Sequence, residues 1–164
     1  MILLAALALA AQQPPANGLD GAYDPNNVFA RILRHQLPAS IVCDDQQVLV
    51  FVPKGWRTPG ELLVIPKRGA RNLLGLHPTE LQRLMIVVQH AAIAQRRALH
   101  STGFQLVQNN GATSFQTVFH VHFHVVPSFG REPLSGDYRA DVSRSEQDAM
   151  AARLKAAWPT KGAC

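Results

Sequence analysis

The stretch 116–127, QTVFHVHFHVVP, places three of the chain's seven histidines at positions 120, 122 and 124. Valine and phenylalanine, which favour strands, fill the positions between them. Side chains alternate between the two faces of a strand, so the three imidazoles are predicted to share one face, about 6–7 Å apart, while Val121, Phe123 and Val125 face the core. Three histidines at strict alternation need a chemical explanation.

Two chemical explanations compete with a third in which the histidines have no chemical role. Neutral imidazole is the commonest metal ligand, but rings spaced along one strand share an ion only if they lean inward, and a further ligand must come from elsewhere. Alternatively, one imidazole attacks phosphorus while its neighbours polarise the phosphate. The polar loop 109–117 supplies donors that an anion would require. A solvated polar strand face is the third explanation, although Ser, Thr or Lys would serve equally there.

Hydrophobic patterning outward from this stretch predicts an α+β fold with a five-stranded antiparallel sheet. Short links between consecutive strands favour a meander with the helices outside it. Thr79 and Gln82 have the spacing of a capping box at the start of the longest helix. The expected strands are 40–43, 47–52, 61–66, 104–108 and 119–126, and the expected helices are 28–35, 79–99 and 145–158.

Size and charge restrict the class of function. A chain of 164 residues with 47% hydrophobic residues suits one globular core. The formal net charge of +5 favours anionic ligands. Basic residues are scattered, and Lys67, Arg68 and Arg71 form the one tight cluster, so a nucleic-acid polymer is not expected as a partner.

The N-terminal region resembles an export signal more than a membrane anchor. Residues 2–11 form an unbroken apolar run, shorter than the roughly 20 residues that span a bilayer, and Ala8-Leu9-Ala10 suits signal cleavage. We therefore predict export to the periplasm or medium, with no membrane span. The absence of Lys and Arg before Arg31 leaves open an ordinary apolar segment of a cytoplasmic protein.

Three segments follow from these patterns. Residues 1–25 are predicted to be a signal peptide and loose leader, 26–130 the functional domain, and 131–164 an extension with one helix. Two distant cysteines make no disulfide framework, and Cys43 is interpreted as a small core residue.

The histidine stretch, together with Asn109-Asn110-Gly111 ahead of it, resembles the signature of histidine triad (HIT) proteins, His-φ-His-φ-His-φ-φ, where φ is apolar. Segments 27–34, 37–42 and 62–67 resemble the N-terminal half of the Hint branch, in the same order. The resemblance covers about residues 26–130. It implies a HIT-like fold, a homodimer and a small-molecule nucleotide substrate. The implied reaction is hydrolysis or transfer at the α-phosphorus of a nucleoside phosphoramidate, dinucleoside polyphosphate or related compound.

The resemblance also assigns roles to the histidines. His122 would be the nucleophile that forms a covalent nucleotidyl-histidine intermediate. The backbone carbonyl of His120 would hold the Nδ1–H of His122, which leaves Nε2 free to attack. His124 would contact the phosphate. No cofactor and no metal are implied.

The same resemblance assigns the binding residues. Gln116 and Thr117 would bind phosphate oxygens or the leaving group, and Asn109 would steady the phosphate loop. The base pocket would be lined by Val28, Phe29 and Ile32.

The sequence departs from the family pattern at three positions, and two of them, Glu61 and Pro53, leave a non-catalytic nucleotide-binding module as the alternative. Glu61 stands where Hint relatives carry a fourth histidine, and a carboxylate there would repel phosphate unless protonated or paired, for instance with Lys67 or Arg68. Pro53 replaces an Asp that accepts from ribose hydroxyls. Phe115 replaces a small residue in the phosphate loop and is expected to narrow the pocket.

Overall fold

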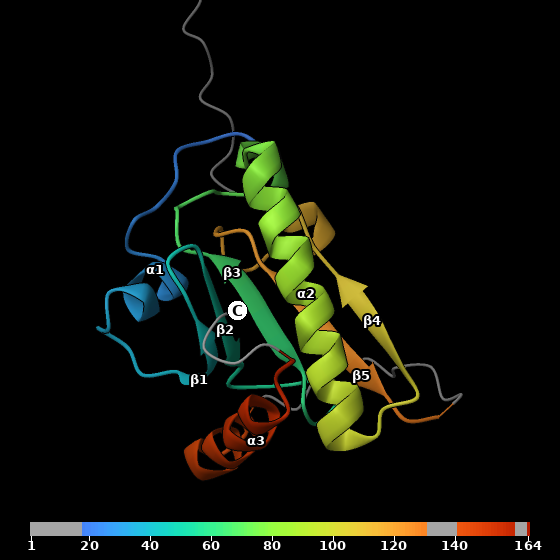
Figure 1. Ribbon diagram of the computed structural model, residues 1–164. Helices are drawn as coiled ribbons and strands as arrows, with labels where there is room; N and C mark the ends of the chain where they lie inside the picture. Colours follow the sequence, from blue (N-terminus) through green and yellow to red (C-terminus); the bar gives the residue numbers. More distant parts are fainter. Residues whose placement is uncertain (1–17, 131–140, 160–163) are drawn as a thin grey trace, which may run out of the picture.

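A five-stranded antiparallel sheet forms the centre of the computed structural model (Figure 1), which describes residues 18–130, 141–159 and 164. The helices flank this sheet, so the predicted α+β class is confirmed. The strands are β1 (Ser40–Asp44), β2 (Val48–Val52), β3 (Leu62–Pro66), β4 (Gly103–Val107) and β5 (Phe123–Ser128). The α-helices are α1 (Val28–Leu33), α2 (Pro78–Leu99) and α3 (Arg144–Ala156), with short 3-10 turns η1 (Leu73–Gly75) and η2 (Ala112–Ser114).

The strand order corrects the predicted meander. In space the order is β1-β2-β3-β5-β4, with every neighbouring pair antiparallel. The last strand therefore inserts between β3 and β4 and leaves β4 at the edge of the sheet. Helix α2 makes this order feasible because it carries the chain from β3 across the sheet to the far edge, as Figure 1 shows.

Strand β5 begins later than expected, at Phe123 rather than at 119. Ahead of it, the Val121 N–H donates to Ala70 O at 2.8 Å instead of joining the ladder. Pairing with β3 starts only at Phe123, opposite Val64. His120 and His122 thus lie in a bend that leads into the strand, and only His124 belongs to it.

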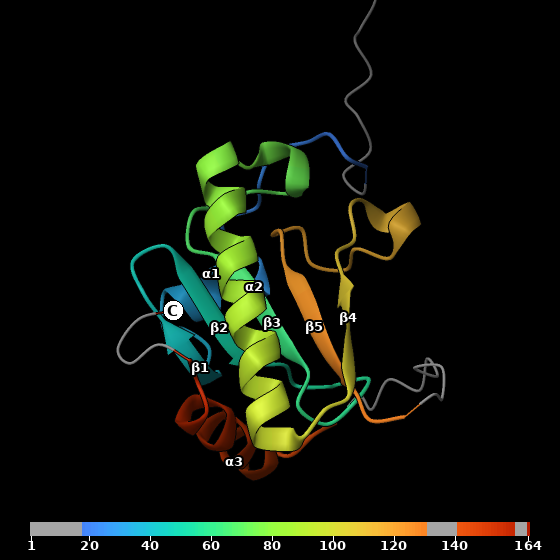
Figure 2. The same ribbon diagram turned by 45° about the vertical axis from the view of Figure 1, so that its right-hand side comes forward.

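Helices lie on both faces of the sheet (Figure 2), and each face carries its own core. Helices α2 and α3 cover one face, where Val121, Phe123 and Val125 are buried as predicted. The short helix α1 covers the other face, where Phe29 packs with Phe51 and neighbouring apolar residues. The alternation along 120–125 therefore directs the histidines away from the α2 core and toward the α1 face.

Helix α2 begins one residue earlier than predicted, and its cap differs. His77 is the N-cap, Pro78 occupies the first helical position, and a Glu80 carboxylate oxygen accepts from the His77 N–H at 2.8 Å. The expected capping box of Thr79 and Gln82 is therefore wrong. Proline at the first position has no N–H to satisfy, so it favours the earlier start.

The chain end returns to the sheet through α3 and a disulfide. Ser143 caps α3 with Glu146, and the helix packs against β1. Cys43 of β1 is bonded to Cys164, which corrects the interpretation of Cys43 as a plain core residue. Sequence spacing alone could not reveal two Cα atoms 5.5 Å apart across 121 positions.

Within the described residues, no helix has the length and apolarity needed to cross a bilayer. The apolar run and cleavage site predicted for export lie outside these residues, as does the whole segment 131–140 that begins the predicted extension.

Candidate active site

His122 is held with one ring nitrogen fixed and the other available. Its Nδ1 lies 2.7 Å from the backbone carbonyl of His120, and a carbonyl can only accept, so Nδ1 carries the proton. Nε2 then has a free lone pair. The side chain is 4% exposed, and burial is the main cause that lowers its pKa to about 4. His122 is therefore a neutral imidazole at pH 7.

The free nitrogen of His122 retains contact with the surface. No described residue hydrogen bonds to it. In the described part of the chain, the fully buried side-chain nitrogens and oxygens without a partner are Gln95 Oε1 and Trp158 Nε1, so Nε2 of His122 is not sealed off. A nucleophile needs this combination of a fixed ring and an accessible nitrogen.

His120 is enclosed, and both of its nitrogens are occupied. Its Nε2 donates to Pro66 O at 2.9 Å, and its Nδ1 accepts from the Tyr23 hydroxyl at 2.7 Å. The side chain is fully buried, and this burial lowers its pKa to about 4. The His120 backbone carbonyl therefore fixes the orientation of the His122 ring, while both nitrogens of the His120 ring are occupied by protein partners.

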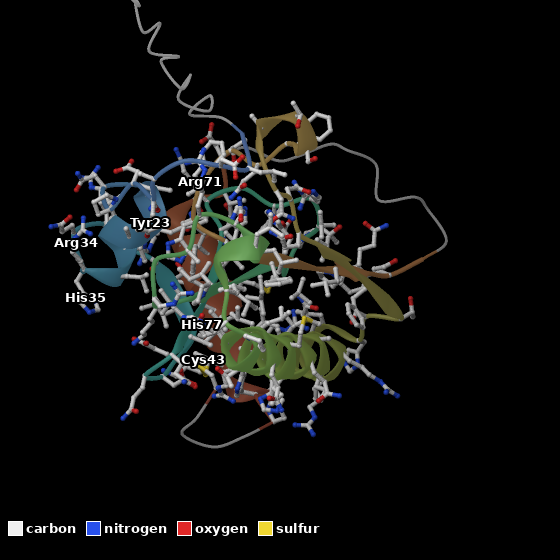
Figure 3. All side chains as sticks on the ribbon, turned by 90° about the horizontal axis from the view of Figure 1, so that it is seen from above. Tyr23, Arg34, His35, Cys43, Arg71 and His77 are labelled. Atoms are coloured by element: carbon white, nitrogen blue, oxygen red, sulfur yellow. A yellow bond between two sulfur atoms is a disulfide. The ribbon has the colours of Figure 1, made fainter. Side chains whose placement is uncertain are left out.

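Tyr23 belongs to a segment that was expected to be a loose leader. The segment 18–25 is docked instead: Arg71 donates to the carbonyls of Gly18 and Ala22, and Asn72 donates to that of Leu19. In Figure 3, Tyr23 and Arg71 lie near each other on the α1 side of the molecule, away from His77 and Cys43. A tyrosine surrounded by Pro, Asn and Gly gives no periodic signal, so the sequence did not reveal it.

Gly69 makes room for Tyr23. A Cβ built at Gly69 would lie 2.5 Å from the Tyr23 ring, closer than van der Waals contact permits. The contact between this glycine and the docked segment therefore fixes the ring whose hydroxyl holds His120.

His124 is bonded to a buried carboxylate. Its Nδ1 lies 2.7 Å from Glu61 Oε1, and Glu61 is 1% exposed. The Arg57 guanidinium also donates to Glu61 Oε1 at 2.9 Å, and the backbone N–H of Arg57 donates to Glu61 Oε2 at 2.6 Å. The expected pairing of Glu61 with Lys67 or Arg68 is wrong, because Lys67 pairs with Asp44 and Arg68 with Glu80.

The rings of His122 and His124 are closer together than an ideal strand allows. The centroids of His122 and His124 are 5.0 Å apart, rather than the expected 6–7 Å, because His122 precedes the regular strand. Within the described residues, no group of three His, Cys, Asp or Glu side chains is arranged to hold a metal ion.

The loop ahead of the histidines is braced from within. Gln116 is 2% exposed; its Oε1 accepts from the Gly111 N–H, and its Nε2 donates to the carbonyls of Arg71 and Val118. Asn109 Nδ2 lies 3.4 Å from Phe115 O, and its role in steadying the phosphate loop stays a prediction. Thr117 is exposed. Phosphate contacts by Gln116 and Thr117 stay predictions.

Phe115 does not narrow a pocket. It is 84% exposed and points into solvent. Its backbone has φ +63°, a left-handed conformation that favours glycine, which explains why a small residue is usual there.

The predicted base-pocket residues lie on α1, beside the histidines. The Phe29 ring is 5.1 Å from His122 and 6.1 Å from His120, edge-on to both. Ile32 packs in the same α1-side core, whereas Val28 is 40% exposed. Phe29 thus packs edge-on against the His122 ring, and contact with a base stays a prediction.

Known proteins are similar to this chain in sequence and in fold. A family model for the HIT domain matches residues 34–131. A HIT-like protein of Saccharolobus solfataricus is 33% identical over 121 residues, covering 73% of this chain and 85% of the relative.

Solved structures agree with these sequence matches. A Hit-like protein of Bartonella henselae, described as involved in cell-cycle regulation, superposes with a TM-score of 0.80 at 35% identity, covering 84% of this chain and 99% of that one. A zinc-bound histidine triad family protein of Mycobacterium smegmatis gives 0.72 at 33% identity, covering 80% and 92%. With the triad, the sheet and the family model in agreement, this chain belongs to the HIT family.

Proposed function

We propose that this protein is a nucleotide hydrolase or transferase that works through a covalent nucleotidyl-His122 intermediate. The observation that carries the proposal is the hydrogen bond from His122 Nδ1–H to the His120 carbonyl. It fixes the tautomer and aims the lone pair of Nε2. The lowered pKa keeps that lone pair available at neutral pH.

The reaction proceeds in two displacements at the α-phosphorus. First, Nε2 of His122 bonds to phosphorus, and the leaving group departs with its bonding electron pair and takes up a proton. Water, or another acceptor hydroxyl, then attacks phosphorus and gives up a proton while the phosphorus–nitrogen bond breaks and its electrons return to His122. Two in-line steps at one nitrogen need no cofactor.

The surroundings of His122 suit a nucleotide. Phe29 offers an apolar wall for a base, and the loop 109–117 lies ahead of the triad with the exposed hydroxyl of Thr117. Phosphoramidates, dinucleoside polyphosphates and nucleotidyl sugars all present an α-phosphorus of this kind, and we propose them as the substrate class.

Covalent labelling tests this function. Purified protein is incubated with adenosine 5′-phosphoramidate or diadenosine polyphosphate that is radiolabelled at the α-phosphorus, then quenched in base and resolved by gel. We expect acid-labile label on the wild type and none on His122→Ala. His77→Ala is the matched control, because His77 is exposed at the start of α2 and should label normally.

The competing outcome identifies a binding module. If the wild type binds AMP but neither becomes labelled nor turns over any of these compounds, the enzymatic proposal fails and the non-catalytic alternative replaces it. If His122→Ala still labels as the wild type does, the nucleophile lies elsewhere.

We also propose a homodimer through the β4 edge. Among the described residues, strand β4 ends the sheet with one side unpaired, and Phe104 and Leu106 on it are 52% and 41% exposed. With Met85 and Ile93 of α2 they line a groove of about 800 Å³. An exposed apolar edge of this kind favours pairing with a second copy.

Finally, we propose that the protein works outside the cytoplasm. The Cys43–Cys164 disulfide suits an oxidising compartment, since cytosolic thiols are kept reduced. This agrees with the apolar run at residues 2–11. Fractionation of the native host, with N-terminal sequencing of the mature chain, tests it.

A further inference from the structure

Glu61 occupies an unusual place for a carboxylate in a site that receives phosphate. It is 1% exposed, and its two oxygens accept three hydrogen bonds, two from Arg57 and one from His124. Arg57 neutralises its charge, so the group does not repel an anion as an isolated carboxylate would. The remaining bond is directed at a histidine of the triad.

Of the three imidazoles, only His124 is placed to serve the leaving group. In an in-line displacement the leaving atom lies on the far side of phosphorus from the nucleophile, so His122 cannot protonate it. His120 has both nitrogens occupied and is fully buried. His124 is partly exposed, and its ring lies 5.0 Å from that of His122.

We propose that Glu61, braced by Arg57, is a positioning residue that holds His124 as the acid for the leaving group and adapts the enzyme to strongly basic leaving groups such as amines. This rests on the function proposed above. A carboxylate bonded to Nδ1–H fixes the ring and stabilises the imidazolium, as the aspartate of a serine protease triad does for its histidine. With Arg57 present, the cluster carries one net positive charge when His124 is protonated.

The proton balance closes over one turnover. When His122 Nε2 bonds to phosphorus, the phosphorus–nitrogen bond to the amine breaks, its electron pair goes to the amine, and His124 Nε2–H supplies the proton. His124 is then neutral, and its Nδ1–H still donates to the Glu61 carboxylate. In the second step it takes the proton of the attacking water, and the electrons of the phosphohistidine bond return to His122.

Leaving-group dependence tests the proposal. Two adenylates are compared: the phosphoramidate of a simple amine, and the 4-nitrophenyl ester, whose leaving group departs without protonation. Removing an acid of this kind costs about 100-fold or more in kcat, and the cost falls on the poor leaving group. In Glu61→Gln we expect kcat for the amine to fall at least about tenfold more than kcat for the ester.

Two further variants separate positioning from structural damage. Glu80→Gln also removes a carboxylate paired with an arginine, but at the start of α2, and should leave the ratio of the two rates unchanged. Arg57→Gln leaves Glu61 without its neutralising partner, and is expected to raise KM for both substrates alike, because the anion then meets an unbalanced carboxylate.

These outcomes distinguish failure of the role proposed for Glu61 from failure of the enzymatic function on which that role rests. If the wild type turns over neither adenylate and is never labelled, the proposed function fails. If the wild type turns over both, and Glu61→Gln slows both by the same factor, the function stands and the role of Glu61 is overturned. Labelling of Glu61→Gln by the nitrophenyl ester shows that the variant is folded.

Discussion

At the scale of single residues, the three histidines of one short stretch have three different environments. The His120 ring is hydrogen bonded to Tyr23 and to the Pro66 carbonyl. The His122 ring is hydrogen bonded to the His120 carbonyl, and the His124 ring to the Glu61 carboxylate. Under the proposed mechanism, these partners, more than the residue type, decide which ring can attack, which can donate a proton and which can only orient. Identical side chains therefore carry separate duties.

The buried rings make folding sensitive to mild acid. Burial lowers the pKa of His120 and His122 to about 4, against 6.5 when exposed. Between these values the unfolded chain binds more protons than the folded one, so stability falls as pH drops from 6.5 toward 4 and is level above about 7. We expect a loss of about 2 kcal/mol per histidine between pH 7 and pH 5.

Urea unfolding at the two pH values measures this loss. Lowered carboxylate pKa values, such as that of Glu80 at about 2, act at more acidic pH and leave this window to the histidines. His122→Asn removes one titrating ring, so its loss should be about half that of the wild type. Equal stability of the wild type at pH 5 and pH 7 would contradict the prediction.

Sequence alternation predicted which face the three histidines share but not what holds them. It placed the three rings on one face because strand geometry is local. It could not find Tyr23 or the contact of Glu61 with Arg57 and His124, because these depend on segments that meet only in three dimensions. The sequence did single out Glu61, because a carboxylate at this position departs from the family pattern, although the partners predicted for it were wrong.

At the scale of elements, all five strands and three α-helices were predicted, and most errors concern their ends. Strand β5 starts at Phe123 because Val121 bonds to Ala70 outside the ladder. The order was predicted as a meander because short links suggest neighbours, but the long α2 allows β5 to lie between β3 and β4. Pairing between distant strands leaves no periodic trace in the sequence.

The edge strand gives a prediction about assembly. Replacing Phe104 and Leu106 together by lysine puts two charges on the exposed side chains of β4, which should block pairing with a second copy. Sedimentation velocity should show a dimer for the wild type and a monomer for this variant. Phe115→Lys, at a more exposed phenylalanine outside the strand, should remain dimeric. A wild type that is monomeric at all concentrations contradicts the proposed dimer.

At the scale of the whole molecule, the chain end is tied back to the first strand. The Cys43–Cys164 bond spans 121 positions, and α3 packs on β1 and α2 beside it. A cross-link over so long a loop restricts the unfolded chain strongly. The stability of the fold therefore depends on a contact that sequence spacing left undetermined.

Removal of this bond gives the last prediction. Cys164→Ser is expected to lower the free energy of unfolding by about 2–5 kcal/mol. Urea unfolding with and without a reductant checks it: the wild type should lose stability when reduced, and the variant should not respond. If reduction leaves the wild type unchanged, the bond does not support the fold.

The same bond affects how the protein is best prepared. Overproduction in an ordinary bacterial cytosol would give protein with both cysteines reduced, whereas targeting to the periplasm or using an oxidising strain would give the cross-linked form. Batches of identical sequence could then melt at different temperatures. Titration of free thiols in each batch, before any assay, would show whether the protein is reduced or disulfide-bonded.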